Sequence, residues 1–562
     1  MKIKDIMGSV ISIINNKTKP LNITLAQLNP TLGYIDGNAA QIIKTWKENN
    51  ASDLIVFPEL FICGYPPEDL VLNPALLKSI ERKIDAICAE TVSFSAAALI
   101  STPWVIDGNL YNAALLIENG AIKHVFTKHL LPNYSVFDEK RVFTSGELPE
   151  AINFRGHKLG IMICEDLWDA RVSKHLKNQG AELLIAINAS PYNYDQYNNR
   201  INISRARIAE TGLSLIYVNM IGGQDELVFD GRSFVMNASG KLIYDAPAFE
   251  EEISTIKLTN KAQIEILKGR ALPVIKQNEL DLIYEALKLG LKDYVHKNGF
   301  SDVIIGLSGG VDSALTAAIA VDALGKDHVR CVMLPFEFTS QTSLDDAKTC
   351  AKMLGVSYDI MPINEAVKAF ENIIPDLSGI AHENTQSRIR GSILMALSNA
   401  SGAMLITTGN KSEMAVGYCT LYGDMNGGFN ALKDVYKTEV YALSSWRGLP
   451  KNIINKEPTA ELRAGQTDQD SLPPYDLLDD ILILLIEHSH IDWKTAPDDL
   501  LEIRERCLKH PKTVEKIACL LKNTEYKRFQ AAPGTRISPY GFGRDRRYPM
   551  TNNFVNKVEK GA

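Results

Sequence analysis

The sequence has no long apolar run, no paired-cysteine motif and no excess of basic residues. No apolar run reaches the roughly 18 residues that a membrane-spanning helix needs. The run from Val10 to Ile14, near the start, is too short and too poorly flanked for a signal peptide. The eight cysteines are scattered without any Cys-x-x-Cys pair, so we expect neither a zinc ribbon nor a disulfide scaffold. These absences favour a cytoplasmic protein with reduced thiols.

Acidic residues slightly outnumber basic ones. The chain has 60 Lys and Arg against 67 Asp and Glu, which gives a formal net charge of −7. Proteins that bind nucleic acid usually present a basic face, so this charge argues against nucleic acid as a partner. With 562 residues, 45% of them hydrophobic, the chain has the size of roughly two to four globular domains.

Short apolar runs separated by turn signals follow Leu21 and are typical of buried strands. The strands predicted in this way are 22–27, 53–57, 97–101, 158–163, 182–187 and 213–218. Helical stretches at 38–49 and 76–90 lie between them. Strands that alternate with helices predict an α/β layered domain. We assign it to 21–258, with 1–20 as an N-terminal extension and a charged, helix-prone linker at 259–290.

A second α/β pattern occupies 291–562. A short buried strand at 303–307 precedes a Gly-rich turn and an Ala-rich helix at 314–324. Further strands are predicted at 329–334 and 403–408. A strand, a tight glycine turn and a helix place a ligand at the carboxyl edge of a parallel sheet, so we expect a nucleotide-type site there.

Three reactive side chains follow apolar strands or turns in the first domain: Glu59, Lys128 and Cys164. A thiol attacks an amide carbonyl only as a thiolate, so it needs a base and a positive neighbour. Glu59 could supply the base, and the ammonium of Lys128 could stabilise the oxyanion. Taken alone, a cysteine after an apolar strand is more often a small buried hydrophobe.

The joint pattern is more specific than any of its members. The motifs Phe-Pro-Glu59, Lys128-x-x-Leu-Pro-Asn-Tyr134 and Cys164-Glu-Asp resemble the nitrilase superfamily over residues 22 to 255. This resemblance implies an α-β-β-α sandwich and a catalytic triad of Glu59, Lys128 and Cys164. Glu139 matches a second acidic position that orients the lysine, although a solvated loop residue is the plainer interpretation.

More narrowly, this part resembles the glutaminase domain of glutamine-dependent NAD⁺ synthetases. The resemblance implies that Tyr134 and Ser190 contact glutamine. Such enzymes usually have a lysine six residues after the serine, where this chain has Gln196, while Arg200 further on is present. Gln196 can form hydrogen bonds but carries no charge, so its part in binding glutamine is open.

A Ser-Gly-Gly-Val-Asp-Ser loop follows the strand at 303–307 and begins a helix. Glycines let backbone N–H groups approach phosphate oxygens, and the helix N-terminus favours negative charge. The loop has no Gly-Lys-Ser/Thr and is therefore not a Walker motif. It resembles the loop of N-type ATP pyrophosphatases, which make adenylates. The residues predicted to bind ATP there are Gly306, Leu307, Ser308, Gly309, Gly310, Val311, Asp312 and Ser313.

GMP synthetase and asparagine synthetase share such a loop, so the downstream motifs must distinguish the substrate. Those motifs resemble NAD⁺ synthetases, in order, over about residues 275 to 550. The resemblance implies that ATP is also contacted by Thr408, Lys437 and Thr459. It implies that Mg²⁺ is held by Asp312 and Glu413, and that deamido-NAD⁺ lies near Asn384, Arg388, Glu413 and Lys527.

Together the two resemblances imply ATP-dependent amidation of deamido-NAD⁺ to NAD⁺, with ammonia from glutamine and an acyl-adenylate intermediate. ATP would be a substrate, Mg²⁺ the metal, and no organic cofactor would be tightly bound. Relatives form homo-oligomers, so we expect at least a dimer. Two alternatives remain open: an adenylating amidotransferase for a different carboxylate, and a non-catalytic nitrilase-like scaffold.

Overall fold

The computed structural model describes residues 19–259, 263–269, 278–489, 491, 496–552, 554, 555 and 558. Residue contacts divide the chain into two compact units. Unit 1 consists of residues 1–224 and 229–276, and unit 2 of residues 225–228 and 277–562. Most of the predicted extension, 1–18, and parts of the predicted linker, 260–262 and 270–277, lie outside the described residues.

Unit 1 contains two mixed sheets. The first is seven-stranded in the order β15-β14-β1-β2-β3-β4-β5, and its strands are β1 (Leu21–Gln27), β2 (Leu54–Val56), β3 (Ala97–Ile106), β4 (Asn109–Glu118), β5 (Ala121–Thr127), β14 (Glu252–Leu258) and β15 (Ile264–Lys268). The second is six-stranded in the order β13-β12-β9-β8-β7-β6, with β6 (Ile152–Phe154), β7 (His157–Ile163), β8 (Leu183–Asn188), β9 (Ser214–Asn219), β12 (Phe234–Met236) and β13 (Leu242–Asp245). β10 (Ile221–Gln224) and β11 (Leu227–Asp230) form a separate two-stranded sheet.

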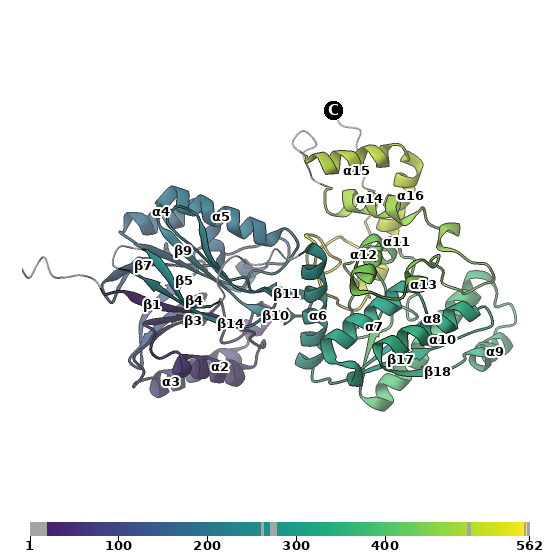
Figure 1. The fold of residues 1–562 in the computed structure, drawn as a ribbon, viewed down its shortest axis with the longest axis horizontal. Helices are drawn as coiled ribbons and strands as arrows, with labels where there is room; N and C mark the ends of the chain where they lie inside the picture. Colours follow the sequence, from purple (N-terminus) through teal and green to yellow (C-terminus); the bar gives the residue numbers. More distant parts are fainter. Residues whose placement is uncertain are drawn as a thin grey trace, which may run out of the picture. The chain divides into compact units, whose positions relative to one another are not determined.

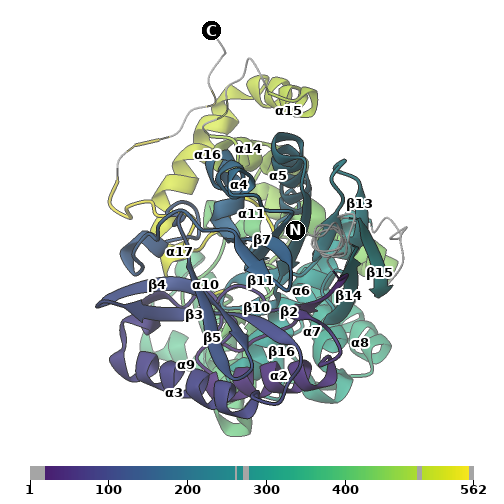
Figure 2. The ribbon, with the colours of Figure 1, turned by 90° about the vertical axis from the view of Figure 1, so that its left-hand side faces the viewer.

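The two sheets of unit 1 face each other across one apolar core. Strands of both sheets contribute side chains to it, among them Ile23, Leu99, Ile161 and Ile185. Helices α2 (Ile35–Glu48) and α3 (Pro74–Glu90) lie outside the first sheet, and α4 (Ala170–Asn178) and α5 (Gln196–Thr211) outside the second (Figures 1 and 2). The predicted α-β-β-α sandwich is therefore confirmed.

The strands predicted from continuous apolar runs are all present within a few residues of their expected ends. The predicted linker at 259–290 differs from expectation, because β15 pairs antiparallel with β14 in it and a helix begins only at Glu279. The burial of β15 alternates between half-buried and exposed residues, as expected for an edge strand rather than a helix. Among the described residues, no helix is long and apolar enough to cross a membrane.

Unit 2 is built on a five-stranded sheet in the order β18-β17-β16-β19-β20. Every adjacent pair of strands is parallel. The strands are β16 (Val303–Gly306), β17 (Val329–Met333), β18 (Ser357–Ile360), β19 (Met404–Thr407) and β20 (Phe429–Asn430). This arrangement confirms the predicted parallel sheet.

Helices surround this sheet and form a second apolar cluster beside it. Those connected with the sheet are α6 (Glu279–Lys297), α7 (Val311–Leu324), α8 (Gln341–Leu354), α9 (Asn364–Ile373), α10 (Gly379–Ser401), α12 (Lys437–Arg447) and α13 (Lys451–Ile454). The others are α11 (Lys411–Val416), α14 (Tyr475–Ile486), α15 (Asp498–Leu508), α16 (Pro511–Asn523) and α17 (Glu525–Phe529). Residues of α11, α14, α15 and α16 share one core, which includes Met414, Leu482, Cys507 and Ile517.

Candidate active sites

The three reactive residues predicted in unit 1 each follow the end of a strand. Glu59 comes after β2, Lys128 directly after β5, and Cys164 directly after β7. Glu59 and Lys128 are fully buried and Cys164 is 4% exposed. Because β2 and β5 belong to one sheet and β7 to the other, the site is assembled from both layers of the sandwich.

Lys128 connects two carboxylates. Its Nζ lies 2.7 Å from Glu59 Oε1 and 2.8 Å from Glu139 Oε1. The amide of Asn112 donates to Glu59 Oε1 at 2.8 Å, and the hydroxyl of Tyr65 donates to Glu139 Oε1 at 2.8 Å. A buried charge is tolerated when it is paired and hydrogen-bonded, and here each of the three charges has at least two partners.

The electrostatics of this cluster favour a neutral thiol at rest. Burial, reinforced by the carboxylate of Glu59, raises the pKa of Cys164 well above its ordinary value, against the opposing charge of Lys128. Burial also raises the pKa of Glu139 to about 7, although Lys128 acts to lower it. Burial would lower the pKa of Lys128, but Glu139 and Glu59 outweigh it and raise that pKa. Glu59 and Lys128 therefore both lie close enough to Cys164 to act on the pKa of its thiol.

The backbone holds Cys164 in an unusual conformation. Its φ of 47° lies in the left-handed region that non-glycine residues rarely adopt. It begins the short helical turn Cys164–Trp168. The carboxylate of Asp166 accepts hydrogen bonds from the N–H of Leu130 at 2.9 Å and of Ile163 at 3.1 Å. Asp166 thus ties the turn of the nucleophile to the segment that follows Lys128.

Ser190 and Gln196, both predicted to contact glutamine, lie next to each other. Gln196 Nε2 is 3.4 Å from Ser190 Oγ, and Arg200 Nε donates to the same Oγ at 3.0 Å. Arg200 is fully buried, and its other nitrogens bind Asp230 at 2.8 Å and the carbonyl of Pro191 at 2.9 Å. These hydrogen bonds occupy the donors of Arg200, which therefore holds the loop of Ser190 in place. Gln196 is a second polar side chain that contacts Ser190 Oγ.

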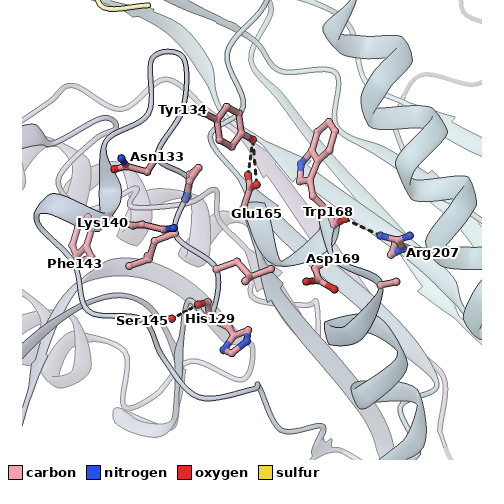
Figure 3. Close-up of a pocket in the computed structure, with 14 residues that line it drawn as sticks. His129, Asn133, Tyr134, Lys140, Phe143, Ser145, Glu165, Trp168, Asp169 and Arg207 are labelled. Carbon is pink, nitrogen blue, oxygen red and sulfur yellow. Dashed lines mark hydrogen bonds between the residues drawn. The ribbon is translucent and has the colours of Figure 1, made fainter.

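A pocket of about 940 Å³ opens beside the turn of the nucleophile. Tyr134, which is 53% exposed, and Glu165 both line it, and the Tyr134 hydroxyl donates to the Glu165 carboxylate at 3.0 Å (Figure 3). Lys140 and Arg207 also line the pocket and add positive charge on opposite sides of it (Figure 3). An acidic and a basic lining in one pocket suits a zwitterionic amino acid.

The Ser-Gly-Gly loop of unit 2 lies between β16 and α7, as predicted. Gly309 has a φ of 81°, and a Cβ there would lie 2.3 Å from the carbonyl oxygen of Ser343, so only glycine fits. Ser313 Oγ lies 3.1 Å from Ser308 Oγ and accepts from the Ser308 N–H at 3.2 Å. The side chains of Leu307 and Val311 are buried in the core, which leaves only their backbone to face a phosphate.

A second buried lysine bridges carboxylates beside this loop. Lys437 Nζ lies 2.5 Å from Asp312 Oδ2 and 3.1 Å from Glu413 Oε1. The amide of Asn410 donates to Asp312 Oδ1 at 2.8 Å. Burial raises the pKa of Glu413 to about 7, against the lowering effect of Lys437. Two carboxylates that converge on one cation fit the oxygen ligands that Mg²⁺ prefers.

The residues predicted near deamido-NAD⁺ gather around the loop 417–424. Asn384 Oδ1 accepts from the Thr420 hydroxyl at 2.8 Å, and Arg388 Nε donates to the Leu421 carbonyl at 3.2 Å. Lys527 Nζ donates to the carbonyl of Cys419 at 2.7 Å. The side chains of Asn384, Arg388 and Lys527 therefore come together although more than a hundred residues separate the first from the last.

Thr408 and Thr459 complete the predicted ATP contacts. Thr408 follows β19 directly and is half-buried. Thr459 donates to the carbonyl of Gln466 at 2.6 Å, within its own loop. The neighbouring Lys456 Nζ reaches the Gly309 carbonyl at 3.4 Å, which connects that loop to the Ser-Gly-Gly turn.

Sequence reasoning gave no role to several side chains that hold these sites together. They are Tyr65 and Asn112, which bind the carboxylates around Lys128, Asp166 beneath the nucleophile, and Asn410 beside Asp312. Asn410 stands three residues before Glu413, which was predicted to bind Mg²⁺. Tyr65 and Asn112 carry no such signal, because their partners lie 74 and 53 residues away.

Two family models match the chain in succession. The carbon-nitrogen hydrolase family matches residues 22–263, and the NAD synthase family matches residues 283–531. A glutamine-dependent NAD(+) synthetase from Rhodobacter capsulatus is 44% identical, with 96% of this chain and 99% of the relative covered. One from Aquifex aeolicus is 42% identical, with 95% and 100% covered.

Solved structures agree with these matches. The glutamine-dependent NAD+ synthetase from Acinetobacter baumannii, in complex with adenosine diphosphate, has a TM-score of 0.74 at 37% identity. That comparison covers 96% of this chain and 100% of the other. A structure from Cytophaga hutchinsonii shares the fold, with a TM-score of 0.76 at 22% identity.

Proposed function

Because this chain belongs to the family of glutamine-dependent NAD(+) synthetases, we propose that it converts deamido-NAD⁺ to NAD⁺ with ATP and with nitrogen from glutamine. One observation carries the proposal. A single chain holds both the buried cluster of Glu59, Lys128 and Cys164 and a Ser-Gly-Gly loop beside Asp312. The first suits amide hydrolysis and the second suits ATP, and glutamine-dependent amidation needs both.

The glutaminase reaction follows from the first cluster. Glu59 takes the proton of Cys164 as the sulfur attacks the amide carbon of glutamine, and the ammonium of Lys128 stabilises the oxyanion. As this intermediate collapses, Glu59 passes the proton to the leaving nitrogen, which releases ammonia, leaves a thioester and restores the Glu59 carboxylate. Water, deprotonated by Glu59, then hydrolyses the thioester to glutamate and restores the thiol.

Glutamine enters through the pocket beside Tyr134. Tyr134 and Ser190 contact the substrate, and Gln196 contributes a hydrogen bond where a lysine would add charge. Glu165 lies next to the nucleophile in sequence and lines the pocket, which supports contact between its carboxylate and the α-ammonium of glutamine. The amide end of the substrate then points toward Cys164.

In the synthetase reaction, the carboxylate of deamido-NAD⁺ attacks the α-phosphorus of ATP and pyrophosphate leaves. Backbone N–H groups of residues 309–313 and the hydroxyls of Ser308 and Ser313 bind the phosphates. Lys437 adds positive charge. Asp312 and Glu413 would hold Mg²⁺, which when bound neutralises phosphate charge. Ammonia then attacks the acyl-adenylate and AMP leaves.

The dinucleotide lies against the loop 417–424. Asn384, Arg388 and Lys527 bind it, together with Glu413. Amide, guanidinium and ammonium donors suit the phosphates and carboxylate of an anionic dinucleotide. We further propose that residues 21–258 form the glutaminase domain and 291–562 the synthetase domain, and that the protein assembles as a homo-oligomer, which sedimentation would measure. A cytoplasmic location stays a prediction.

The decisive experiment supplies deamido-NAD⁺, ATP and either glutamine or ammonium, and measures NAD⁺ and pyrophosphate. We expect NAD⁺ with both nitrogen sources. An adenylating amidotransferase for another carboxylate would release no pyrophosphate with deamido-NAD⁺. A non-catalytic scaffold would leave Cys164 unreactive toward an electrophilic glutamine analogue.

A further inference from the structure

Lys411, the first residue of α11, is fully buried and ion-paired. Its Nζ lies 2.9 Å from Asp434 Oδ1 and 2.9 Å from Glu487 Oε1. It also donates to Ser538 Oγ at 2.8 Å and to the carbonyl of Tyr540 at 3.0 Å. An ammonium has three N–H donors, so these acceptors account for all of them.

Two of these partners belong to a segment that we name the C-terminal strap, residues 533–541. The N–H of Asn430, at the end of β20, donates to the Pro533 carbonyl at 2.8 Å. A Cβ on Gly534 would lie 2.1 Å from the Asn430 carbonyl oxygen, so the strap passes very close to β20. The strap lies beyond the last residue, 531, that the NAD synthase family model matches.

Asp434 joins Lys411 to the strap a second time. Its Oδ2 accepts hydrogen bonds from the N–H of Ile537 at 2.8 Å and of Ser538 at 2.7 Å. Its Oδ1 accepts from the Ser538 hydroxyl at 2.9 Å. Ser538 therefore contacts both members of the Lys411–Asp434 pair, and the strap cannot shift without disturbing that pair.

The residues on either side of Lys411 face the ATP site. Asn410 donates to Asp312 at 2.8 Å, and its own Oδ1 accepts from the Glu413 N–H at 2.9 Å. Asn410 thereby caps α11 and contacts both residues predicted to bind Mg²⁺, Asp312 at its carboxylate and Glu413 at its backbone. A rotation of α11 by a fraction of a turn would move both contacts.

The residue after Lys411 orients the second lysine. Ser412 Oγ accepts from the backbone N–H of Lys437 at 2.9 Å, and Ser412 also donates to Asp479. Asp479 in turn accepts from the Thr438 N–H at 2.9 Å. The start of α12, which carries Lys437, is thus fixed against the same turn of α11.

We propose that Lys411 is a positioning residue for ATP cleavage, and that through it the C-terminal strap sets the relative positions of Asp312, Glu413 and Lys437. Lys411 does not touch substrate. It fixes the turn of α11 from which Asn410, Ser412 and Glu413 reach the reacting groups. The inference rests on the proposed synthetase function.

The test compares the parent protein with the double variant Lys411→Met, Glu487→Gln. This pair removes one positive and one negative charge, so the net charge of the cluster is unchanged. Asp434 loses its lysine but keeps the hydrogen bonds from the N–H groups of Ile537 and Ser538. We expect kcat for ammonium-supported pyrophosphate release to fall about 100-fold per folded molecule, because a displacement of about 1 Å is enough for such a loss. The KM for ATP should change less than about threefold, since the loop backbone still binds the phosphates.

Ser538→Ala is the second variant, because it removes one hydroxyl and folds more readily than a change at a buried ion pair. Its kcat should fall about tenfold, a hydrogen bond to a charged group being worth about that factor. Lys297→Met is the matched control. It removes a largely buried lysine that pairs with Asp293 at 3.2 Å on α6, and kcat should stay at the parent value.

Labelling of Cys164 by an electrophilic glutamine analogue reports on unit 1, and thermal unfolding gives the folded fraction. A parent-like kcat per folded molecule in the double variant, or in Ser538→Ala, would overturn the inference and leave Lys411 a purely structural pair. A parent protein without pyrophosphate release on deamido-NAD⁺ and ATP would instead overturn the proposed function.

Discussion

Lys128 in unit 1 and Lys437 in unit 2 each lie buried between two carboxylates of a candidate site, and these two clusters differ in access to solvent. The side chain of Lys128 is fully buried and that of Lys437 is 3% exposed. The carboxylates around Lys128 are equally closed, with Glu59 fully buried. Those around Lys437 are partly open, with Asp312 at 17% and Glu413 at 18%.

Because of this difference in exposure, Lys128 keeps its place between the carboxylates, whereas the place of Lys437 is open to another cation. In unit 1 nothing from solvent can replace Lys128 between its two carboxylates, so the lysine acts where it stands. In unit 2 the carboxylates are partly open to solvent, so in the mechanism that we propose Mg²⁺ would take the place of the ammonium and Lys437 would bind phosphate. One lysine and two carboxylates would thus form a fixed oxyanion site in unit 1 and an exchangeable cation site in unit 2 under the proposed function.

The largest effect is expected from Asp312→Ala, which removes one side of the open cluster. NAD⁺ formation and pyrophosphate release should fall by about 1,000-fold or more with either nitrogen source, because phosphate charge loses its main compensation. Pyrophosphate release is the measurement. Retained release would remove Asp312 from the metal assignment.

Cys164→Ala should abolish the proposed activity of unit 1 and spare that of unit 2. Glutamine-supported NAD⁺ formation should fall at least about 1,000-fold, because no other residue supplies the nucleophile. Ammonium-supported formation should stay near the parent rate. An equal loss of both activities would contradict the division of labour between the clusters.

The rate of glutamine hydrolysis should depend on pH through the buried cluster around Lys128. The pKa of Glu139, raised by burial to about 7, means that Glu139 is a carboxylate above that pH and neutral below it. The rate should therefore fall as pH drops through about 7. Glu139→Gln should lower the rate about tenfold at pH 8 and remove this step, since a charge-assisted hydrogen bond is lost.

Ammonium-supported synthesis by Glu139→Gln is the control for that experiment and should match the parent. If the step near pH 7 persisted in glutamine hydrolysis by this variant, another group would be its source.

The smallest effect is expected at Gln196, which lies beside Ser190 in unit 1. Gln196→Lys restores the charge usual in related glutaminases and should lower KM for glutamine by about threefold, the gain of one solvent-screened contact. The kcat should not change. Steady-state kinetics at several glutamine concentrations would detect this, and a raised KM would mean that Ser190 needs an uncharged neighbour.

The predictable part of the fold is the part with continuous apolar runs. β8, for example, is buried at every position and was expected from its sequence. β5 was missed because most of its residues are exposed, which leaves no apolar pattern to detect. β16, β17 and β19 of unit 2 were predicted for the same reason as β8. β18 was not, because its residues are half-buried or exposed, and neither was β20, which has only two residues.

The site was predictable where the motifs are local. Glu59, Lys128 and Cys164 stand in recognisable flanks, and so do Ser308 and Asp312. The supporting groups were not, because Tyr65 and Asn112 reach their partners only after both sheets have formed. Lys411 was not predicted either, because its partners Asp434, Glu487 and Ser538 come from distant segments of the chain.

The pairing of β1 with β14 has a consequence for the order in which the protein is made. Leu21 pairs with Leu258, and Gln27 with Glu252. β1 can therefore form this pairing only after β14 has been synthesised, much later in the chain. Domains generally fold as they leave the ribosome, yet the first sheet of unit 1 stays incomplete until residue 258 has emerged. The nascent chain therefore carries Cys164 without a finished site around it until residue 258 has emerged, and glutamine hydrolysis cannot begin before most of the first unit exists.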